Sequence, residues 1–187
     1  SSSYEVKDAE GTDVTRNYTV TSVEDGYITI KADELNDTAF EVGGLSDVTY
    51  DAESHKQAPT VTDTERETVL EAGTDYDVTY STEDFVNVGT ITVTITGKGN
   101  YSGMVTKNYQ IKEREIKVTG NNDTVTYDGE EHIVSGVTAT GLVTGHAISS
   151  EAAVAARTEE GTTSMGLTTS SSYEVKDAEG TDVTRNY

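Results

Sequence analysis

The stretch TITVTIT at residues 90–96 alternates β-branched apolar side chains with threonine over seven positions. Successive side chains of an extended strand point to opposite faces, so Ile91, Val93 and Ile95 share one face and the threonines share the other. This pattern predicts a strand with one buried face and one solvated face. Shorter runs of the same kind occur at residues 19–23, 27–30, 76–80 and 123–127.

Turn residues separate these runs. Asp25 and Gly26 lie between the runs at 19–23 and 27–30, and an Asp-Gly pair in that position is typical of a β-hairpin, because glycine adopts a positive φ without a Cβ clash. Short strands roughly 8–12 residues apart, with Gly, Asn and Asp between them, favour an antiparallel sandwich. The expected fold class is therefore all-β, with tandem small antiparallel β-sandwich modules (Ig-like or related) in an elongated array.

Helix signals are scarce. The sequence EAAVAAR at residues 151–157 is the only helix-favouring patch, and it is flanked by threonine, serine and glycine. Seven residues are too few for a stable isolated helix. We expect a strand or a single turn at this position.

The chain contains repeats at two levels. Its first 18 residues, SSSYEVKDAEGTDVTRNY, occur again unchanged at residues 170–187, which gives a period of 169 residues. Inside this unit, SDVTYDAESH (46–55) aligns with DTVTYDGEEH (123–132), and TKNY (106–109) aligns with TRNY (184–187). Self-similarity of this kind is the signature of an array of small modules.

The alignment divides the chain into three parts. Residues 31–115 form one module, called module A, and residues 116–187 form a related module B that lacks its last hairpin. Residues 1–30 hold the C-terminal strands of a preceding B module. Between Tyr109 and Gly120 the sequence contains no Gly, Pro or Ser, so we expect the last strand of A to pass almost directly into the first strand of B. The longer joint between Tyr18 and Tyr50 is expected to hold either an extra strand or a softer hinge.

The orphan strands in residues 1–30 carry a further expectation. They either pair with the incomplete B module of a neighbouring chain by strand addition or mark a cut from a continuous filament.

Charge and composition exclude several classes of function. The net charge is −21 and only 33% of the residues are hydrophobic, so nucleic acids and anionic membrane surfaces would be repelled. The chain has no cysteine, which excludes disulfides and thiolate chemistry. It also has no apolar run of the length needed to span a membrane, so no membrane insertion is expected in this segment.

The sequences VTYDGEEH (125–132), TGLVTGHAI (140–148), GTTSMG (161–166) and VKDAEGTDVTRNY (175–187) resemble the YDG and MBG class of bacterial surface repeats. Module A is similar through YDAESHKQAP (50–59), GTDYDVTY (73–80), NVGTITVTITGKGNYSG (87–103) and TKNYQI (106–111). The resemblance implies all-β modules in secreted or wall-anchored proteins of Gram-positive and gut bacteria. It carries no catalytic residues. Ala52 stands where the YDG motif has glycine, which is expected to affect that turn.

The repeated acidic loop is a candidate calcium site, because carboxylate oxygens are the ligands that Ca²⁺ prefers and glycine lets the chain bend around an ion. A solvated hairpin turn explains the same residues. The candidate ligands are Asp8, Glu10 and Asp13 in the first copy and Asp177, Glu179 and Asp182 in the second.

Catalytic chemistry is not expected. His55 and His132 occupy equivalent positions in the two modules, so a role in the repeated turn explains them better than a shared metal site. No sequence context supports a serine nucleophile. The glycine-rich sequence GKGNYSG (97–103) lacks the Ser or Thr that follows a P-loop lysine, and a hairpin with Tyr101 packed on the sheet is expected instead. The chain is therefore predicted not to be an enzyme and to need no cofactor.

The function expected from these features is mechanical. The chain is predicted to be a stalk or spacer segment of a long repetitive bacterial surface protein, extracellular and anchored to the cell surface or cell wall, with adjacent repeats as its partners. Its negative charge would keep the array soluble and extended. The alternative is an adhesin module that binds host glycan, mucin or protein through repeated weak sites, where exposed tyrosines could stack on sugars.

Overall fold

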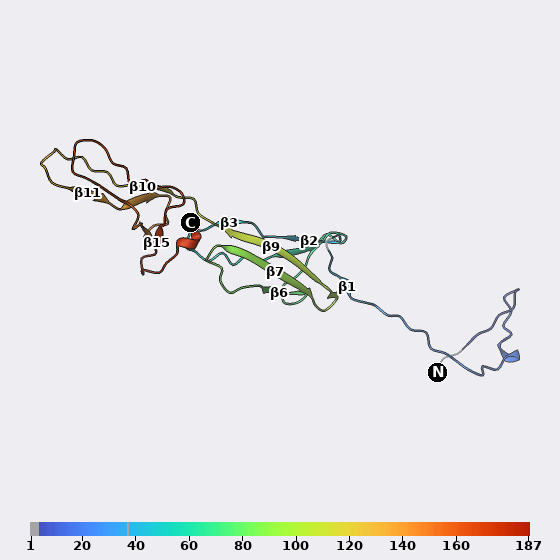
Figure 1. Ribbon diagram of the computed structural model, residues 1–187. Coiled ribbons are helices and arrows are strands. Elements are labelled where there is room, and N and C mark those ends of the chain that lie inside the picture. Colours follow the sequence, from blue (N-terminus) through green and yellow to red (C-terminus); the bar gives the residue numbers. More distant parts are fainter. Residues whose placement is uncertain (1–3, 37) are drawn as a thin grey trace. The chain divides into compact units, whose positions relative to one another are not determined.

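The computed structural model describes residues 4–36 and 38–187, and the chain forms two compact units, Ser1–Lys31 and Ala32–Tyr187. The regular structure of the described residues consists of β-strands and two short 3-10 helices (Figure 1). The all-β prediction is confirmed at this level. Within these residues no helix has the length and apolar character needed to cross a membrane.

The first unit is held by local contacts. Lys7 and Asp13 form an isolated antiparallel bridge, and the Val14 N–H donates to the Val6 carbonyl at 2.8 Å. The 3-10 helix η1 (Thr15–Asn17) follows. No strand forms at residues 18–32, so the predicted hairpin around Asp25 and Gly26 is absent. A two-stranded hairpin is only marginally stable by itself in water, and these residues have no third strand to pair with.

Module A contains a four-stranded sheet with the order β3-β9-β7-β6 (Figure 1). The threonine-rich stretch forms the centre of β7 as predicted, and Ile91, Val93 and Ile95 are at most 2% exposed. Strand β3 pairs with β9 in parallel, whereas β9-β7 and β7-β6 are antiparallel. The strands are β3 (Val48–Thr49), β6 (Tyr76–Tyr80), β7 (Gly89–Gly97) and β9 (Met104–Lys112).

A second sheet of module A has the order β2-β4-β5. Phe40 of β2 and Val61 of β4 share one buried cluster with Tyr76 and Ile95 of the first sheet, so apolar side chains of both sheets meet in a common core. A short parallel pair joins β1 to β8 in the turn between β7 and β9. These strands are β1 (Asp33–Glu34), β2 (Phe40–Gly43), β4 (Thr60–Asp63), β5 (Thr68–Val69) and β8 (Tyr101–Ser102).

Two expectations for module A are confirmed by this arrangement. The glycine-rich stretch at 97–103 is the turn between β7 and β9, and Tyr101 packs edge-on against Phe40 with 5.8 Å between the ring centroids. Strand β1 also provides an extra strand in the long joint before Tyr50. The boundary between the two units, at Lys31, lies in the same joint.

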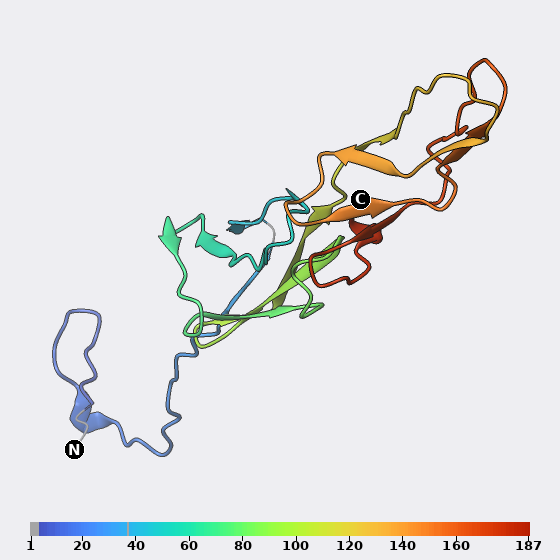
Figure 2. The same cartoon turned by 90° about the vertical axis from the view of Figure 1, so that its left-hand side faces the viewer.

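Module B contains three antiparallel strand pairs, β10-β12, β11-β14 and β13-β15. Long irregular segments connect them (Figure 2). Strand β14 confirms that residues 151–157 form no helix. The elements are β10 (Lys117–Gly120), β11 (His132–Ser135), β12 (Val137–Thr140), β13 (Ala147–Ser149), β14 (Val154–Arg157), β15 (Glu174–Lys176) and the 3-10 helix η2 (Thr184–Asn186).

The strand predicted at residues 123–127 does not form. The equivalent strand of module A, β3, pairs with Ile111 and Lys112 at the end of β9. Residues 123–127 therefore have the sequence of a strand, but none of the described strands pairs with them.

Candidate functional site

The candidate calcium ligands lie in two turns of the same local structure. In the first copy, one carboxylate oxygen of Asp8 accepts from the N–H groups of Glu10 (3.1 Å) and Thr12 (2.8 Å), and Asp13 accepts from the N–H of Thr15 (2.9 Å). In the second copy, Asp177 accepts from Glu179 and Thr181, and Asp182 accepts from Thr184. These carboxylates hold the turns through local hydrogen bonds.

Electrostatics agrees with this structural role. Hydrogen bonds from the hydroxyl and then the N–H of Thr15 lower the pKa of Asp13, and the same bonds from Thr184 lower the pKa of Asp182. In residues 4–36 and 38–187, no group of three or more His, Asp or Glu side chains is placed to hold a metal ion. Calcium binding at either turn stays a prediction for experiment.

The equivalent histidines of the two modules make the same contact. The His55 ring lies 2.8 Å from an oxygen of Asp51, and the His132 ring lies 2.9 Å from an oxygen of Asp128. The pKa of each aspartate is lowered. The largest cause is a hydrogen bond from the backbone N–H two residues further on, and the hydrogen bond from the histidine lowers the pKa further. The repeated Asp-His pair therefore belongs to the repeated turn.

The same turn shows why glycine suits the position that directly follows the aspartate. Gly129 of module B has φ +87°, and Ala52 at the equivalent position of module A has φ +67°. This left-handed conformation costs a residue with a Cβ about 1–2 kcal/mol relative to the right-handed one. Module A keeps the turn and carries that strain at Ala52.

The most highly organised polar cluster lies where module A meets the end of module B. Asn186 is fully buried, and its side-chain oxygen accepts from the Val88 N–H at 2.9 Å while its amide donates to the Asn87 side chain at 2.9 Å. The carbonyl of Asn186 accepts from the Arg114 N–H at 2.9 Å. One residue of η2 thus binds both the loop before β7 and the linker after β9.

Side chains next to Asn186 extend this junction. Arg185 donates to Asp84 at 3.0 Å, and Tyr187 packs edge-on against Tyr50 with 5.5 Å between the ring centroids. The Tyr187 hydroxyl accepts from the Val143 N–H at 3.2 Å and lies 2.8 Å from Nδ1 of His146. Tyr187 therefore joins the buried aromatic cluster of module A to the loop before β13 of module B.

Asp84 is held as an anion at this junction. The N–H of Asn87, and then its side-chain amide, donate to the Asp84 carboxylate and lower its pKa to about 2, with a smaller contribution from the Arg185 charge. The loop before β7 is thereby fixed in the shape that receives Asn186.

The two identical 18-residue copies show which features depend on the contact with module A. Both form the same bridge and the same 3-10 helix, preceded by valines with nearly equal backbone angles. Asn17 is nevertheless exposed, whereas Asn186 is fully buried, and Tyr18 is 63% exposed. Local structure therefore follows from the sequence of the copy, and burial follows from the presence of module A.

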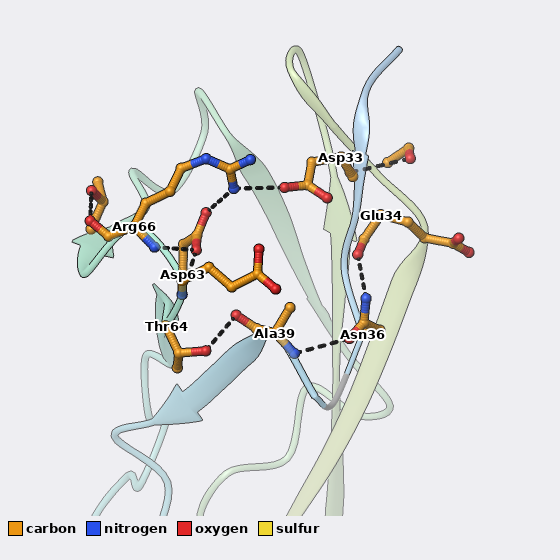
Figure 3. Close-up of polar contacts among 10 residues, drawn as sticks. Asp33, Glu34, Asn36, Ala39, Asp63, Thr64 and Arg66 are labelled. Atoms are coloured by element: carbon orange, nitrogen blue, oxygen red, sulfur yellow. Dashed lines mark hydrogen bonds and ion pairs between the residues drawn. The ribbon is translucent and has the colours of Figure 1, made fainter.

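A second buried polar group ties the start of module A to its smaller sheet. Asp63 is fully inaccessible to solvent and accepts from the N–H groups of Glu65 and Arg66 at 3.0 Å each (Figure 3). The Arg66 guanidinium bonds the other oxygen of Asp63 and also Asp33 at 2.7 Å. Burial raises the pKa of Asp63, but these bonds outweigh it and the pKa lies below its ordinary value.

A groove is present in module B beside the unpaired residues 123–127. Its volume is about 690 Å³, and its lining includes Val125, Tyr127, Ile133 and Arg157. Of these, Val125, Tyr127 and Ile133 are between 49% and 65% exposed. The groove therefore presents apolar side chains next to a backbone segment that has no ladder partner.

Comparisons with known proteins give no further identity, because no protein-family model, curated protein or solved structure matches the chain. The resemblance to YDG and MBG repeats stays a prediction. Neither the junction nor the groove is predicted from the sequence. The Asn-Tyr pairs at 17–18, 108–109 and 186–187 recur at the same point of each repeat, but the sequence does not show that one of them meets module A.

Proposed function

We propose that this chain is a structural segment of a long, repetitive bacterial surface protein, and that it acts as a stalk or spacer rather than as an enzyme. In this proposal modules A and B are small antiparallel β-sandwiches that alternate along an elongated extracellular array. The array holds an adhesive or other functional region away from the cell. Its partners are the adjacent repeats of the same protein.

The observation that carries the proposal is the junction at Asn186. A flexible linker would leave the facing surfaces of the two modules hydrated, whereas here one fully buried side chain receives and donates hydrogen bonds across the boundary. A buried polar group is stable only when its bonds are made in one geometry, so such a contact fixes orientation as well as proximity. Fixed orientation between neighbours is what a spacer requires.

Two further features support the same role. Only the four residues 113–116 separate β9 from β10, and Arg114 in that linker donates to Asn186 and to the carbonyls of Gly141 and Tyr50. The linker is thus hydrogen-bonded both to module A, at Tyr50, and to module B, at Gly141 and Asn186. The net charge of −21 adds mutual repulsion between successive units, which opposes collapse of an array at low ionic strength.

The proposal is tested with tandem chains in which the 187-residue chain is extended by none, one or three further 169-residue units. Small-angle X-ray scattering should show a maximum dimension that grows in proportion to the number of units. The matched control carries Asn186→Ala at every junction, and its dimension should grow more slowly because the joints bend. A wild-type series that approaches the dimension of a compact globule would contradict a stalk.

Exposed tyrosines favour one alternative, an adhesin module that binds host glycan, mucin or protein. Tyr27 is 92% exposed and Tyr127 is 65% exposed, and exposed aromatic rings can stack on sugars. A glycan array separates the two functions. Reproducible binding that is lost in Tyr27→Ala or Tyr127→Ala, with retention in Tyr4→Ala as a control, would establish the adhesin alternative.

A further inference from the structure

The chain leaves module A through a single long strand. Strand β9 ends at Lys112, directly before the linker of residues 113–116. Strand β8 leads into β9 after one residue, Gly103, and the two are called here the exit strand. On one edge β7 pairs with β9 along nearly its whole length. A force applied to the linker therefore reaches module A first through the exit strand.

The strand by which the chain enters module A is bonded to the start of the exit strand. Strand β1 pairs in parallel with β8, and the Leu35 N–H donates to the Ser102 carbonyl at 2.9 Å. Figure 3 shows this entering strand, marked by Asp33 and Glu34, beside the exit strand. Both strands of the pair run in the same direction.

A side-chain bridge also ties β1 to the smaller sheet. The Arg66 guanidinium donates to Asp33 of β1 at 2.7 Å and to the buried Asp63 of β4 (Figure 3). Hydrogen bonds between two ionised groups are stronger than those between neutral groups. Strand β1 is therefore held on one side by β8 and on the other by Arg66.

A second parallel pair lies at the other end of the exit strand. Val48 of β3 is opposite Ile111, and Thr49 is opposite Lys112. The Tyr50 N–H donates to the Lys112 carbonyl at 2.9 Å. At about 3.3 Å per residue this pair lies about 30 Å along the exit strand from the pair of β1 with β8.

Asp47 extends this second pair with its side chain. One carboxylate oxygen of Asp47 accepts from the Gln110 N–H at 2.9 Å, and the other lies 2.7 Å from Nζ of Lys112. The bond from Lys112, and then the bond from the Gln110 N–H, lower the pKa of Asp47. The carboxylate thus bonds to the exit strand directly before β3 begins at Val48.

The direction of these pairs determines how module A responds to tension. Pulling at residues 32 and 113 moves the entering chain and the exit strand in opposite directions. Strands that run the same way and are pulled from opposite ends have to slide along each other, which loads the hydrogen bonds of the pair together. Strands pulled apart from the same end lose their bonds one after another. Sliding therefore needs more force than separation from one end.

We propose that module A is a tension-bearing unit whose resistance to extension comes from the two parallel pairs on the exit strand. The pair of β1 with β8 is loaded first. When it opens, the force passes through β2 to β3, and the pair of β3 with β9 is the last to fail. The inference rests on the proposed function, since only a segment held at both ends is stretched. Scattering measures the length of the array and pulling measures its resistance, so either result can fail without the other.

The test compares two pulling directions on the full 187-residue chain in optical tweezers. The chain has no cysteine, so introduced pairs give unique attachment points. Ala32→Cys with Glu113→Cys pulls module A from entry to exit, and Glu53→Cys with Glu113→Cys pulls β3 and β9 from the same end. All three positions are exposed.

The two directions should give different unfolding rates at the same constant force. Several bonds break together only in the entry-to-exit direction, and each slows unfolding by roughly fivefold, so unfolding should be roughly a hundredfold slower in that direction. Equal rates in the two directions, or faster unfolding from entry to exit, overturn the proposal.

The length released identifies the pair that fails last. Residues 32–113 span about 29 nm when fully extended. Because residues 48–112 stay folded until β3 leaves β9, a single event should release at least about 20 nm of this length. Release in a series of small steps of similar size overturns the order of failure.

Two matched substitutions test the part played by Asp47. Asp47→Ala removes both of its bonds to the exit strand and should speed entry-to-exit unfolding about tenfold, with the same-end rate within about twofold of the wild type. Asp77→Ala removes another exposed carboxylate, which lies 3.2 Å from Nζ of Lys98 outside both parallel pairs, and should leave both rates unchanged. An equal change in both directions for Asp47→Ala, or an equally large effect of Asp77→Ala, overturns the assignment.

Discussion

Replacing Asn186 with alanine should destabilise the chain, whereas the same change at Asn17 should not. The two asparagines lie in identical 18-residue sequences and both occupy the last position of a 3-10 helix. Asn186 is fully buried against module A and Asn17 is exposed. The pair is therefore an internal control in which propensity and neighbouring sequence are held constant and only the junction differs.

The magnitude follows from the bonds that are lost. Asn186→Ala removes the bonds to the Val88 N–H and to the Asn87 side chain, each worth about 1 kcal/mol. It also leaves the Val88 N–H without its partner, which adds about 1–3 kcal/mol where water cannot enter. We expect a loss of roughly 3–5 kcal/mol in the free energy of unfolding. For a unit of this size the Tm then falls by roughly 6–20 °C.

The assay is thermal unfolding of dilute protein followed by circular dichroism, with urea unfolding to obtain the free energy. Asn17→Ala should change the free energy by less than about 0.5 kcal/mol, as is usual for an exposed position. Equal losses in the two variants would refute the reasoning, because the junction would then contribute nothing beyond the local turn.

Three other predictions follow from the turns and the charges. Ala52→Gly should raise stability by roughly 0.5–1 kcal/mol in urea unfolding, because relief of the left-handed strain exceeds the entropic cost of glycine, and Gly129→Ala should lower it. The pKa of Asp84 is lowered from its ordinary 3.8 to about 2, so the ionised carboxylate stabilises the folded chain above pH 4 and this stabilisation is lost as the pH falls towards 2. Asp84→Asn has no carboxylate to protonate, so its free energy of unfolding, measured by circular dichroism, should fall less over that pH interval. Calcium binding at Asp8 or Asp177 predicts that the Tm rises with added Ca²⁺ and falls with chelator, and an unchanged Tm removes that hypothesis.

The strands that could be predicted from sequence are those whose partners lie within module A. The alternation around Val93 predicts the buried face of β7, and the alternation at residues 76–80 predicts β6 with its observed bounds. The same kind of pattern at residues 123–127 and 19–30 was equally clear and formed no strand. The alternation of apolar and polar residues predicts which face of a strand is buried. A strand forms only if a second strand is available for hydrogen bonding, and the presence of that second strand depends on the tertiary structure.

The junction could not be predicted for a related reason. Asn186 and Asn17 are identical in sequence context, so no local signal distinguishes the buried residue from the exposed one. The acidic turns could be interpreted in two ways from composition alone, and the hydrogen bonds of Asp8 and Asp177 to nearby N–H groups appear only in three dimensions. The residue types show which interactions a carboxylate or an asparagine can make, but the tertiary structure determines which groups lie close enough to make them.

The position of the junction also determines how an array of these modules can change in length. Asn186, in the 3-10 helix η2 of module B, binds the A module that precedes it in the chain. Recombination between the two identical 18-residue copies would remove or add 169 residues, which is one A module together with one B module. Every remaining B end would still follow an A module, so no mismatched contact is created. If the chain is part of the proposed stalk, the length of that stalk could be altered in whole steps by exchange between copies of its gene sequence, with each joint left chemically the same.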